Sequence, residues 1–518
     1  MRYPLHGIVA GVLALASTVL AQSVLDTPAG RSIKLETLKH HVYALAADSM
    51  EGRDTGSKGY EKAARYVEGV FRRIGAKTML TDDRNRSTYR QDLQFWRAAE
   101  ADSGSLEVVS VTGKVRFKQG RDFKFDTMVG PEILAQALGA VYVGYGIGRG
   151  SWDDYRGLNL KGKVAVMLSR IPEQNSGLPD SLVQLYKGSR RSNQRVEAAQ
   201  AHGAVAVLRL ADGWTSQYWK TFGDALMAAG LRRLADSEPG EGEAARLTVL
   251  QSVAQSLFKG QAIMPLDSTA GAPPYKGFAL EGVSLRFKPG PRSGVVASPN
   301  VVGCIRGTDS ALRDEYIVVG AHLDHVGRRD GEICNGADDN ASGVAALLEV
   351  AEAVASRPLP RSVCFVAFTG EEKGLLGSKY FVGHSPIPME KIAFMINLDM
   401  MGRTASSLDS SRSHLVYYSD EGDEAIKNMI ERLNRGTVHW TLKMRRAGGS
   451  ARSDHGSFMD RDVPVTFFYS GNHGDYHRPT DDADKIDYEK LYALSRLVYA
   501  LVAETASKPG PVFPRSDH

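Results

Sequence analysis

The sequence predicts an α/β protein, with a mostly parallel sheet sandwiched by helices and a β-rich segment inserted into it. From residue 300 onward, short apolar runs alternate with helical patterns, which is typical of a sheet covered by helices. Between residues 101 and 290, short β-branched or apolar runs bounded by glycine are frequent, and this pattern favours strands. The chain has 518 residues, more than one compact core normally holds, so at least two domains are expected.

Residues 1–21 have the pattern of a signal peptide. Arg2 precedes an apolar run of about 14 residues, whereas a membrane-spanning helix needs roughly 20. Val19 and Ala21 are small residues at the −3 and −1 positions, which predicts cleavage after Ala21. We therefore expect a secreted or periplasmic protein with no stable membrane insertion. A membrane anchor is the alternative interpretation of the same run.

Charge and cysteine content exclude some functions. The formal net charge is +4 and does not indicate a nucleic acid partner. The three cysteines are too few for a disulfide framework. Cys304 and Cys364 lie in strand-like runs and are expected to be buried. Cys334 lies near acidic residues, so a metal-ligand role for it is a minor alternative.

The predicted elements follow one another in three parts. Residues 22–100 contain amphipathic helical patterns at 33–48 and 58–74, separated by a glycine-rich polar loop. The insert follows and closes at a link rich in Pro and Gly. In residues 291–518, strands are predicted at 315–323, 362–368, 392–400, 413–419 and 463–469, and helices at 342–356, 373–383, 422–435 and 487–505.

Titratable residues gather where the predicted strands of this last part end, which is where such sheets carry their chemistry. In "AHLDH", His322 and Asp324 lie two residues apart and so share one face of an extended strand. A metal-bound imidazole usually donates its other N–H to a carboxylate, so His322 is a candidate ligand and Asp324 its orienting partner. A polar strand end is the alternative.

Two acidic pairs suggest a positive partner. In "NGADDNASG", Asp338 and Asp339 precede an apolar helix, and a carboxylate that bridges two cations would remove their repulsion. We expect Asp338 to bridge and Asp339 to support the turn. In "FTGEEKGLLGS", the side chains of Glu371 and Glu372 diverge, so one can bind metal while the other acts as general base. Solvated acidic helix starts are the alternative in both motifs.

Two further residues complete the set. Asp399 ends an apolar strand, where an unpaired carboxylate is costly. His477 lies in a polar turn before the last helix, with His473 and His455 as nearby alternatives. Two imidazoles and three carboxylates suit divalent ions, with zinc the leading candidate. The five expected ligands are His322, Asp338, Glu372, Asp399 and His477.

In their order along the chain, these motifs resemble the two-zinc exopeptidases of metallopeptidase family twenty-eight, the group that resembles bacterial leucyl aminopeptidases. The motifs span residues 321 to 487, and "LAADSMEGRDTGSKGYEKAARYVEGVFRRIGA" is similar to the N-terminal helices of that domain. The resemblance implies the zinc exopeptidase fold. The insert is similar to a protease-associated domain in "DYRGLNLKGKVAVML" and "VEAAQAHGAVAVLRL".

The resemblance also implies a distribution of roles around two zinc ions per chain. His322 and Asp399 would hold one zinc, Glu372 and His477 the other, and Asp338 would bridge them. Glu371 would be the general base, Asp324 would orient His322, and Tyr476 would help polarise the substrate carbonyl. A cis peptide bond would follow the bridging aspartate, between Asp338 and Asp339.

The expected function is an aminopeptidase that acts on peptide or protein substrates. A carboxypeptidase on the same fold, with arginines such as Arg403, Arg445, Arg446 and Arg452 to bind the substrate carboxylate, is one alternative. A glutaminyl cyclase with a single zinc is another. A receptor-like protein without activity is the third, although such a relative would be expected to have lost ligands, and none is lost here.

Overall fold

The computed structural model describes the chain between Leu25 and Phe513, with internal gaps. The gaps are residues 99–103, 126–135, 151, 172–176, 187–191, 214, 217–218, 220–230, 235–244, 262–275, 289–291, 330, 406, 409–412, 419–423 and 448–452. The predicted signal peptide therefore lies outside the described residues. Within them, no helix combines the length and the apolar character needed to cross a bilayer.

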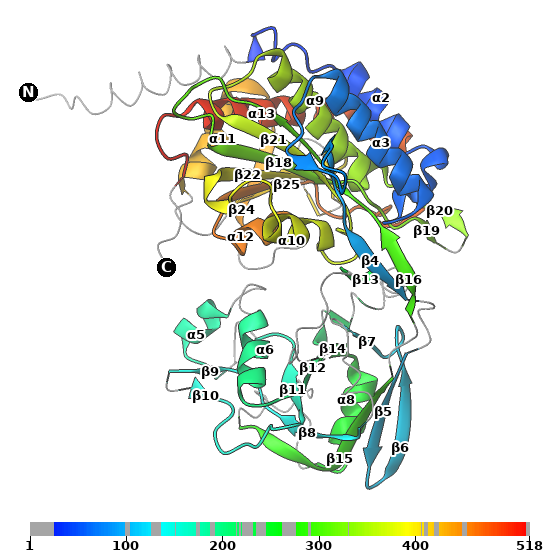
Figure 1. Ribbon diagram of the computed structural model, residues 1–518. Coiled ribbons are helices and arrows are strands. Elements are labelled where there is room, and N and C mark those ends of the chain that lie inside the picture. Colours follow the sequence, from blue (N-terminus) through cyan, green and yellow to red (C-terminus); the bar gives the residue numbers. More distant parts are fainter. Residues whose placement is uncertain are drawn as a thin grey trace, which may run out of the picture. The chain divides into compact units, whose positions relative to one another are not determined.

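The chain divides into two compact units. One consists of Met1–Leu93 together with Ala297–His518, and the other is Gln94–Val296. Figure 1 labels many of their helices and strands. The second unit starts seven residues earlier and ends six residues later than the predicted insert of 101–290. The first unit contains every residue singled out above as a candidate for chemistry.

The first unit is built on an eight-stranded sheet whose order is β24-β23-β25-β22-β18-β21-β17-β3. Its four central neighbours β21, β18, β22 and β25 run parallel, while β17 and β3 at one side are antiparallel to their neighbours. The strands are Arg90–Gln91 (β3), Asn300–Ile305 (β17), Tyr316–His322 (β18), Ser362–Phe368 (β21), Ile392–Asp399 (β22), Ser413–Tyr418 (β23), Thr441–Arg446 (β24) and Val465–Tyr469 (β25).

Helices cover both faces of this sheet (Figure 1). The alternation along β18 shows how, because Ile317 and Val319 join a core with the first group of helices while Val318 faces the second. The first group is Leu35–Leu45 (α2), Lys58–Arg73 (α3), Gly343–Ser356 (α9), Glu424–Thr437 (α11) and Tyr488–Ser507 (α13). The second group is Leu376–Gly383 (α10) and His455–Met459 (α12).

The structure confirms the predicted α/β class and the main elements of the last part. The five predicted strands there correspond to β18, β21, β22, β23 and β25. Strand β24 and helix α12 were not predicted. The run "TLKMRR" of β24 is basic and partly exposed, as edge strands often are, and α12 has only five residues.

The second unit has a core of its own around another eight-stranded sheet, ordered β6-β5-β15-β8-β11-β12-β14-β7. Its strands are Ser105–Ser110 (β5), Gly113–Lys118 (β6), Phe123–Phe125 (β7), Leu138–Tyr142 (β8), Val164–Leu168 (β11), Ala206–Leu210 (β12), Ala245–Val249 (β14) and Phe278–Lys288 (β15). Its described helices are Asp180–Leu185 (α5), Ser192–Ala201 (α6) and Gln251–Phe258 (α8). The prediction of a β-rich insert is confirmed.

The cysteines differ from expectation in one respect. Cys304 and Cys364 are both buried, as predicted, but they face each other across the antiparallel pair β17 and β21 and form a disulfide. Sequence spacing alone does not show that two strands will be neighbours, so the bond was not predicted. Cys334 is a buried free thiol, and it belongs to neither of the potential metal-binding groups found among the described residues.

Candidate metal centre

The candidate residues converge because three parallel strands end at the same edge of the sheet. Strand β18 ends at His322, β22 ends at Asp399, and the turn that carries Glu371 and Glu372 follows β21. In parallel neighbours the carboxyl ends lie side by side, and this is where α/β sheets place their sites. The loop before α13 adds His477.

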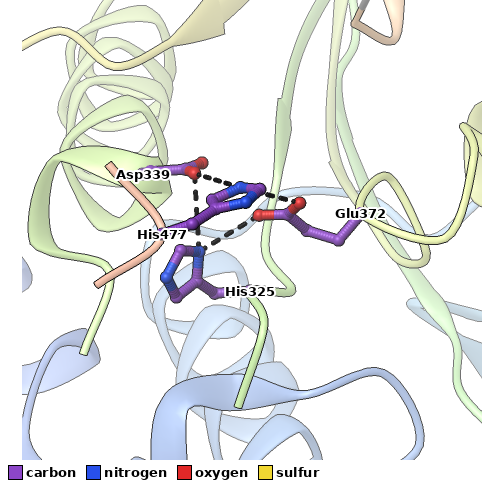
Figure 2. Close-up of side chains that lie close together, drawn as sticks. All are labelled: His325, Asp339, Glu372 and His477. Carbon is purple, nitrogen blue, oxygen red and sulfur yellow. Dashed lines mark hydrogen bonds and ion pairs between the residues drawn. The ribbon is translucent and has the colours of Figure 1, made fainter. Parts of the chain in front are cut away.

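Two groups of buried side chains could each hold a cation. The first consists of His325, Asp339, Glu372 and His477, which Figure 2 shows turned toward one another. His477 Nε2 lies 3.1 Å from Asp339 Oδ2 and 3.0 Å from Glu372 Oε2. His325 Nδ1 lies 3.1 Å from Glu372 Oε1 and 3.6 Å from Asp339 Oδ2.

The second group contains three side chains and shares one of them with the first. His322 Nε2 lies 3.3 Å from Asp339 Oδ1 and 3.3 Å from Asp399 Oδ1. Asp339 therefore presents one oxygen to each group. A carboxylate placed in this way can bridge two metal ions, which is the arrangement expected of a two-metal hydrolase.

The prediction that Asp338 occupies the shared position is wrong, because Asp339 lies there. The carboxylate of Asp338 accepts hydrogen bonds from the Gly402 N–H at 2.6 Å and from the hydroxyls of Ser342 and Ser470, both at 3.1 Å. Adjacent side chains point in different directions, and the sequence does not say which of the two aspartates faces the strand ends. The cis peptide bond likewise lies one residue later than predicted, between Asp339 and Asn340.

The backbone before the shared aspartate is held by buried charges. Asp481 accepts the N–H groups of Asp338 and Asp339 at distances of 3.1–3.2 Å. The Arg53 guanidinium donates to the carbonyls of Asn335 and Gly336 at 2.7 and 2.9 Å. Each of these charges is satisfied by main-chain groups, so they fix the turn and leave the carboxylate of Asp339 free for its imidazole neighbours.

Gly336 is required by close approach. Its φ is +59°, and a Cβ there would lie 2.2 Å from the Asp339 carbonyl oxygen and 2.5 Å from the ring of His325. Both contacts are too short for real atoms. The glycine therefore permits the turn that brings the aspartate pair next to this imidazole.

Asp324 lies beside His322, but through a different atom from the one predicted. The Nδ1 of His322 is 3.0 Å from the main-chain oxygen of Asp324, not from its carboxylate. The carboxylate instead accepts the N–H groups of Glu371 and Glu372 at 3.1 and 3.3 Å, and the Thr55 hydroxyl at 2.9 Å. Asp324 therefore orients the histidine with its backbone and the glutamate turn with its side chain.

Glu371 is partly exposed at the edge of the two groups, and it belongs to neither. Desolvation raises the pKa of its carboxyl well above the usual range, and the nearby carboxylate of Glu372 adds to this while His322 opposes it. By contrast, the imidazoles around Glu372, led by His477, hold its pKa at about 2 despite burial. Two consecutive glutamates thus have opposite electrostatic environments, as a division of roles requires.

The ionisation of the central groups reflects their mutual contacts. Burial disfavours charge on Asp339, but the imidazoles that face it hold its pKa well below the usual range. Burial also disfavours protonated His477, yet the carboxylates of Glu372 and Asp339 raise its pKa to about 10. A divalent cation would take the place of the proton on His477.

The donor set fits metal ions. Asp339 Oδ2 is buried and close to two imidazole nitrogens, yet among the described residues it accepts no hydrogen bond of acceptable geometry. When imidazole nitrogens and carboxylate oxygens bind one cation, their lone pairs point at that cation. The nitrogen and oxygen atoms then lie close together without forming a hydrogen bond. Imidazole and carboxylate ligands of this number are those that zinc prefers.

The alternatives to His477 lie elsewhere. His473 Nε2 contacts Asp338 Oδ2 at 3.3 Å, and His455 stacks on Phe467, so neither belongs to the two groups. Tyr476 stacks on His477 with ring centroids 3.9 Å apart. His325 was missed by the sequence reasoning, although it directly follows Asp324 in "AHLDH", and an imidazole one residue beyond a predicted orienting group was a usable signal.

Comparisons with known proteins show similarity to peptidases. Residues 300–502 match the model of Peptidase family M28. Aminopeptidase YwaD of Bacillus subtilis is 30% identical over 226 residues, which is 41% of this chain and 45% of that protein. Leucine aminopeptidase 1 of Ajellomyces capsulatus is 28% identical over 207 residues, 37% of this chain and 53% of that protein. The chain thus spans about half the length of these curated relatives.

Among solved structures, an aminopeptidase from Aneurinibacillus sp. strain AM-1 resembles this chain with a TM-score of 0.55. The match has 21% identity and covers 94% of this chain and 98% of that one. At this identity the likeness shows a shared fold. It extends over both compact units of the chain.

Proposed function

We propose, from the match of residues 300–502 to the model of Peptidase family M28, that this protein is a zinc aminopeptidase with two metal ions. It would hydrolyse peptide bonds at the free N-terminus of peptide or protein substrates. The observation that carries the proposal is the pair of buried ligand groups that share Asp339. The names of the relatives, which are aminopeptidases, support the same activity.

The proposed ligands differ from the sequence expectation at one position. His322 and Asp399 would hold one zinc, Glu372 and His477 the other, and Asp339 would bridge them. When bound, the ions would polarise the scissile carbonyl and make water a nucleophile at neutral pH. Each of the five side chains is buried or nearly so, which excludes competing solvent from the ligand atoms.

Glu371 is the proposed general base. It would take a proton from the attacking water and deliver it to the leaving amine, because one carboxyl group can serve as base and then as acid. The side chain of Asp324 accepts the Glu371 N–H and so holds the turn on which the base stands. Tyr476, stacked on His477, is proposed to contact the substrate carbonyl.

Removal of residues from the amino end is favoured over removal from the carboxyl end. A carboxypeptidase needs a free cation for the substrate carboxylate. Arg403 is the candidate nearest in sequence to Asp399, and it already pairs with Asp475 at 3.0 Å. Arg445 and Arg446 lie exposed on β24, and Arg452 lies outside the described residues. An α-ammonium would instead meet a site rich in carboxylates.

The test uses one peptide in three forms: free, N-acetylated and C-amidated. Acetylation should abolish cleavage because it removes the α-ammonium charge, and amidation should be tolerated. Cleavage would be followed by mass spectrometry of the products over time. The opposite pattern would identify a carboxypeptidase, and cleavage of all three forms would identify an endopeptidase.

We also propose that the protein is exported and processed after Ala21. Export is supported by the charged start and short apolar run of residues 1–21. N-terminal sequencing of protein recovered from the medium or the periplasm should begin at Gln22. An intact N-terminus in membrane fractions would contradict the proposal.

The insert is proposed to be a protease-associated-like domain without catalytic groups. Its independent core and the absence of metal-binding groups from its described residues support this. A folded variant in which a short linker replaces residues 94–296 should still bind two zinc ions and cleave an aminoacyl anilide. Loss of zinc from that folded variant would show that the insert contributes to the site.

A further inference from the structure

We propose that His325 is a fourth protein ligand of the metal ion held by Glu372 and His477, so that the two metal sites differ. The inference rests on the proposed two-metal function and adds a ligand to it. One site would be closed by four side chains, His325, Asp339, Glu372 and His477. The other would have three, His322, Asp339 and Asp399, and would keep a position for water.

The distances within the first group support coordination. A zinc ion bound tetrahedrally at about 2.0–2.1 Å keeps neighbouring ligand atoms roughly 3.3 Å apart. His325 Nδ1 lies 3.1 Å from Glu372 Oε1 and 3.6 Å from Asp339 Oδ2, and His477 Nε2 lies at 3.0 and 3.1 Å from the same two carboxylates. The two imidazoles thus approach the same pair of carboxylates from different sides (Figure 2).

A simple hydrogen bond explains less of this geometry. One N–H can donate well to Glu372, but it would leave the second carboxylate, Asp339, facing the same nitrogen without a proton between them. A cation at the centre accounts for both approaches at once. The second ring nitrogen of His325, Nε2, has no hydrogen-bond partner among the described residues. Its contacts therefore do not show which of the two ring nitrogens carries the proton.

The surrounding backbone is built to keep this imidazole in place. His325 is fully buried, and its main-chain N–H donates to the Arg53 carbonyl at 3.2 Å. Gly336 approaches the ring so closely that no Cβ would fit. The rings of His325 and His477 meet edge to face, with centroids 5.5 Å apart. The side chain is therefore fixed by its neighbours rather than turned toward the group by chance.

A closed site and an open site have different chemistry. Zinc with four protein ligands is typical of tightly held, structural ions, whereas catalytic zinc keeps a position for water or substrate. With His325 as a ligand, the position for water therefore belongs to the ion held by His322 and Asp399. The ion beside Glu372 would then serve mainly to fix Asp339 and to add positive charge.

X-ray absorption spectroscopy of the full chain loaded with two zinc ions tests the assignment. Scattering from the outer atoms of the imidazole rings reports how many imidazoles are bound to zinc. We expect three imidazoles per two zinc ions in the unaltered protein. Two imidazoles, with a functional dinuclear peptidase, would overturn the inference and leave the proposed function intact. Failure to bind two zinc ions would instead overturn the proposed function.

The variant His325→Gln separates a ligand from an orienting group, because a glutamine amide can still donate a hydrogen bond to Glu372. The count should fall to two imidazoles, and zinc affinity at one site should fall by more than about 100-fold, which exceeds the usual cost of losing a group that only orients a ligand. His473→Gln is the matched control, since His473 is buried nearby but in neither group. An unchanged count and affinity in His325→Gln would show that His325 only orients Glu372.

Discussion

Replacing Glu371 by glutamine should lower kcat by about 10²-fold or more while both metal ions stay bound. Glutamine has nearly the same shape but cannot take a proton from water, and loss of a general base costs roughly this much. The Glu371 N–H bond to Asp324 should persist, because it involves the backbone. Steady-state kinetics on an aminoacyl anilide, with zinc measured on the same samples, would show the effect.

The control for this variant is Glu390→Gln, the same chemical change at an exposed position in the short helix Met389–Lys391 (η4). Its kcat and zinc content should match those of the unaltered protein. Near-normal turnover in Glu371→Gln would show that another group accepts the proton. Loss of zinc in that variant would show that Glu371 is a ligand.

Replacing Asp339 by asparagine should weaken zinc binding at both sites, with an activity loss at least as large. Asp339 directs Oδ1 to one group and Oδ2 to the other, and an amide offers only one oxygen and no charge. Asp399→Asn should weaken one site only, because Asp399 belongs to a single group. Zinc retained after dialysis against a graded chelator series would distinguish these outcomes.

The neighbouring change, Asp338→Asn, is the sharpest comparison. Asp338 accepts hydrogen bonds from Gly402, Ser342 and Ser470, several of which an asparagine oxygen can keep. Its variant should therefore retain more zinc than Asp339→Asn. The reverse ranking, or release of a single zinc from the Asp339 variant, would contradict the shared position assigned to Asp339.

Much of the fold could be predicted from the sequence because its signals are local. The apolar runs of β18, β21 and β22 and the periodicity of α9 and α13 each lie within one continuous segment. Pairings between segments that are distant in the sequence were harder to predict. The disulfide Cys304–Cys364 depends on β17 lying against β21, and the short α12 leaves too weak a pattern to detect.

The sequence by itself determined the kind of site: which strand ends carry it, and that His322, Glu372, Asp399 and His477 would come together there. Residue type and position along a strand contain that information. Only the tertiary structure decided which of two adjacent aspartates is shared, which atom of Asp324 faces His322, and that His325 joins the group. These depend on side-chain directions in a turn held by the distant residues Arg53 and Asp481, and such directions are set by packing rather than by sequence order.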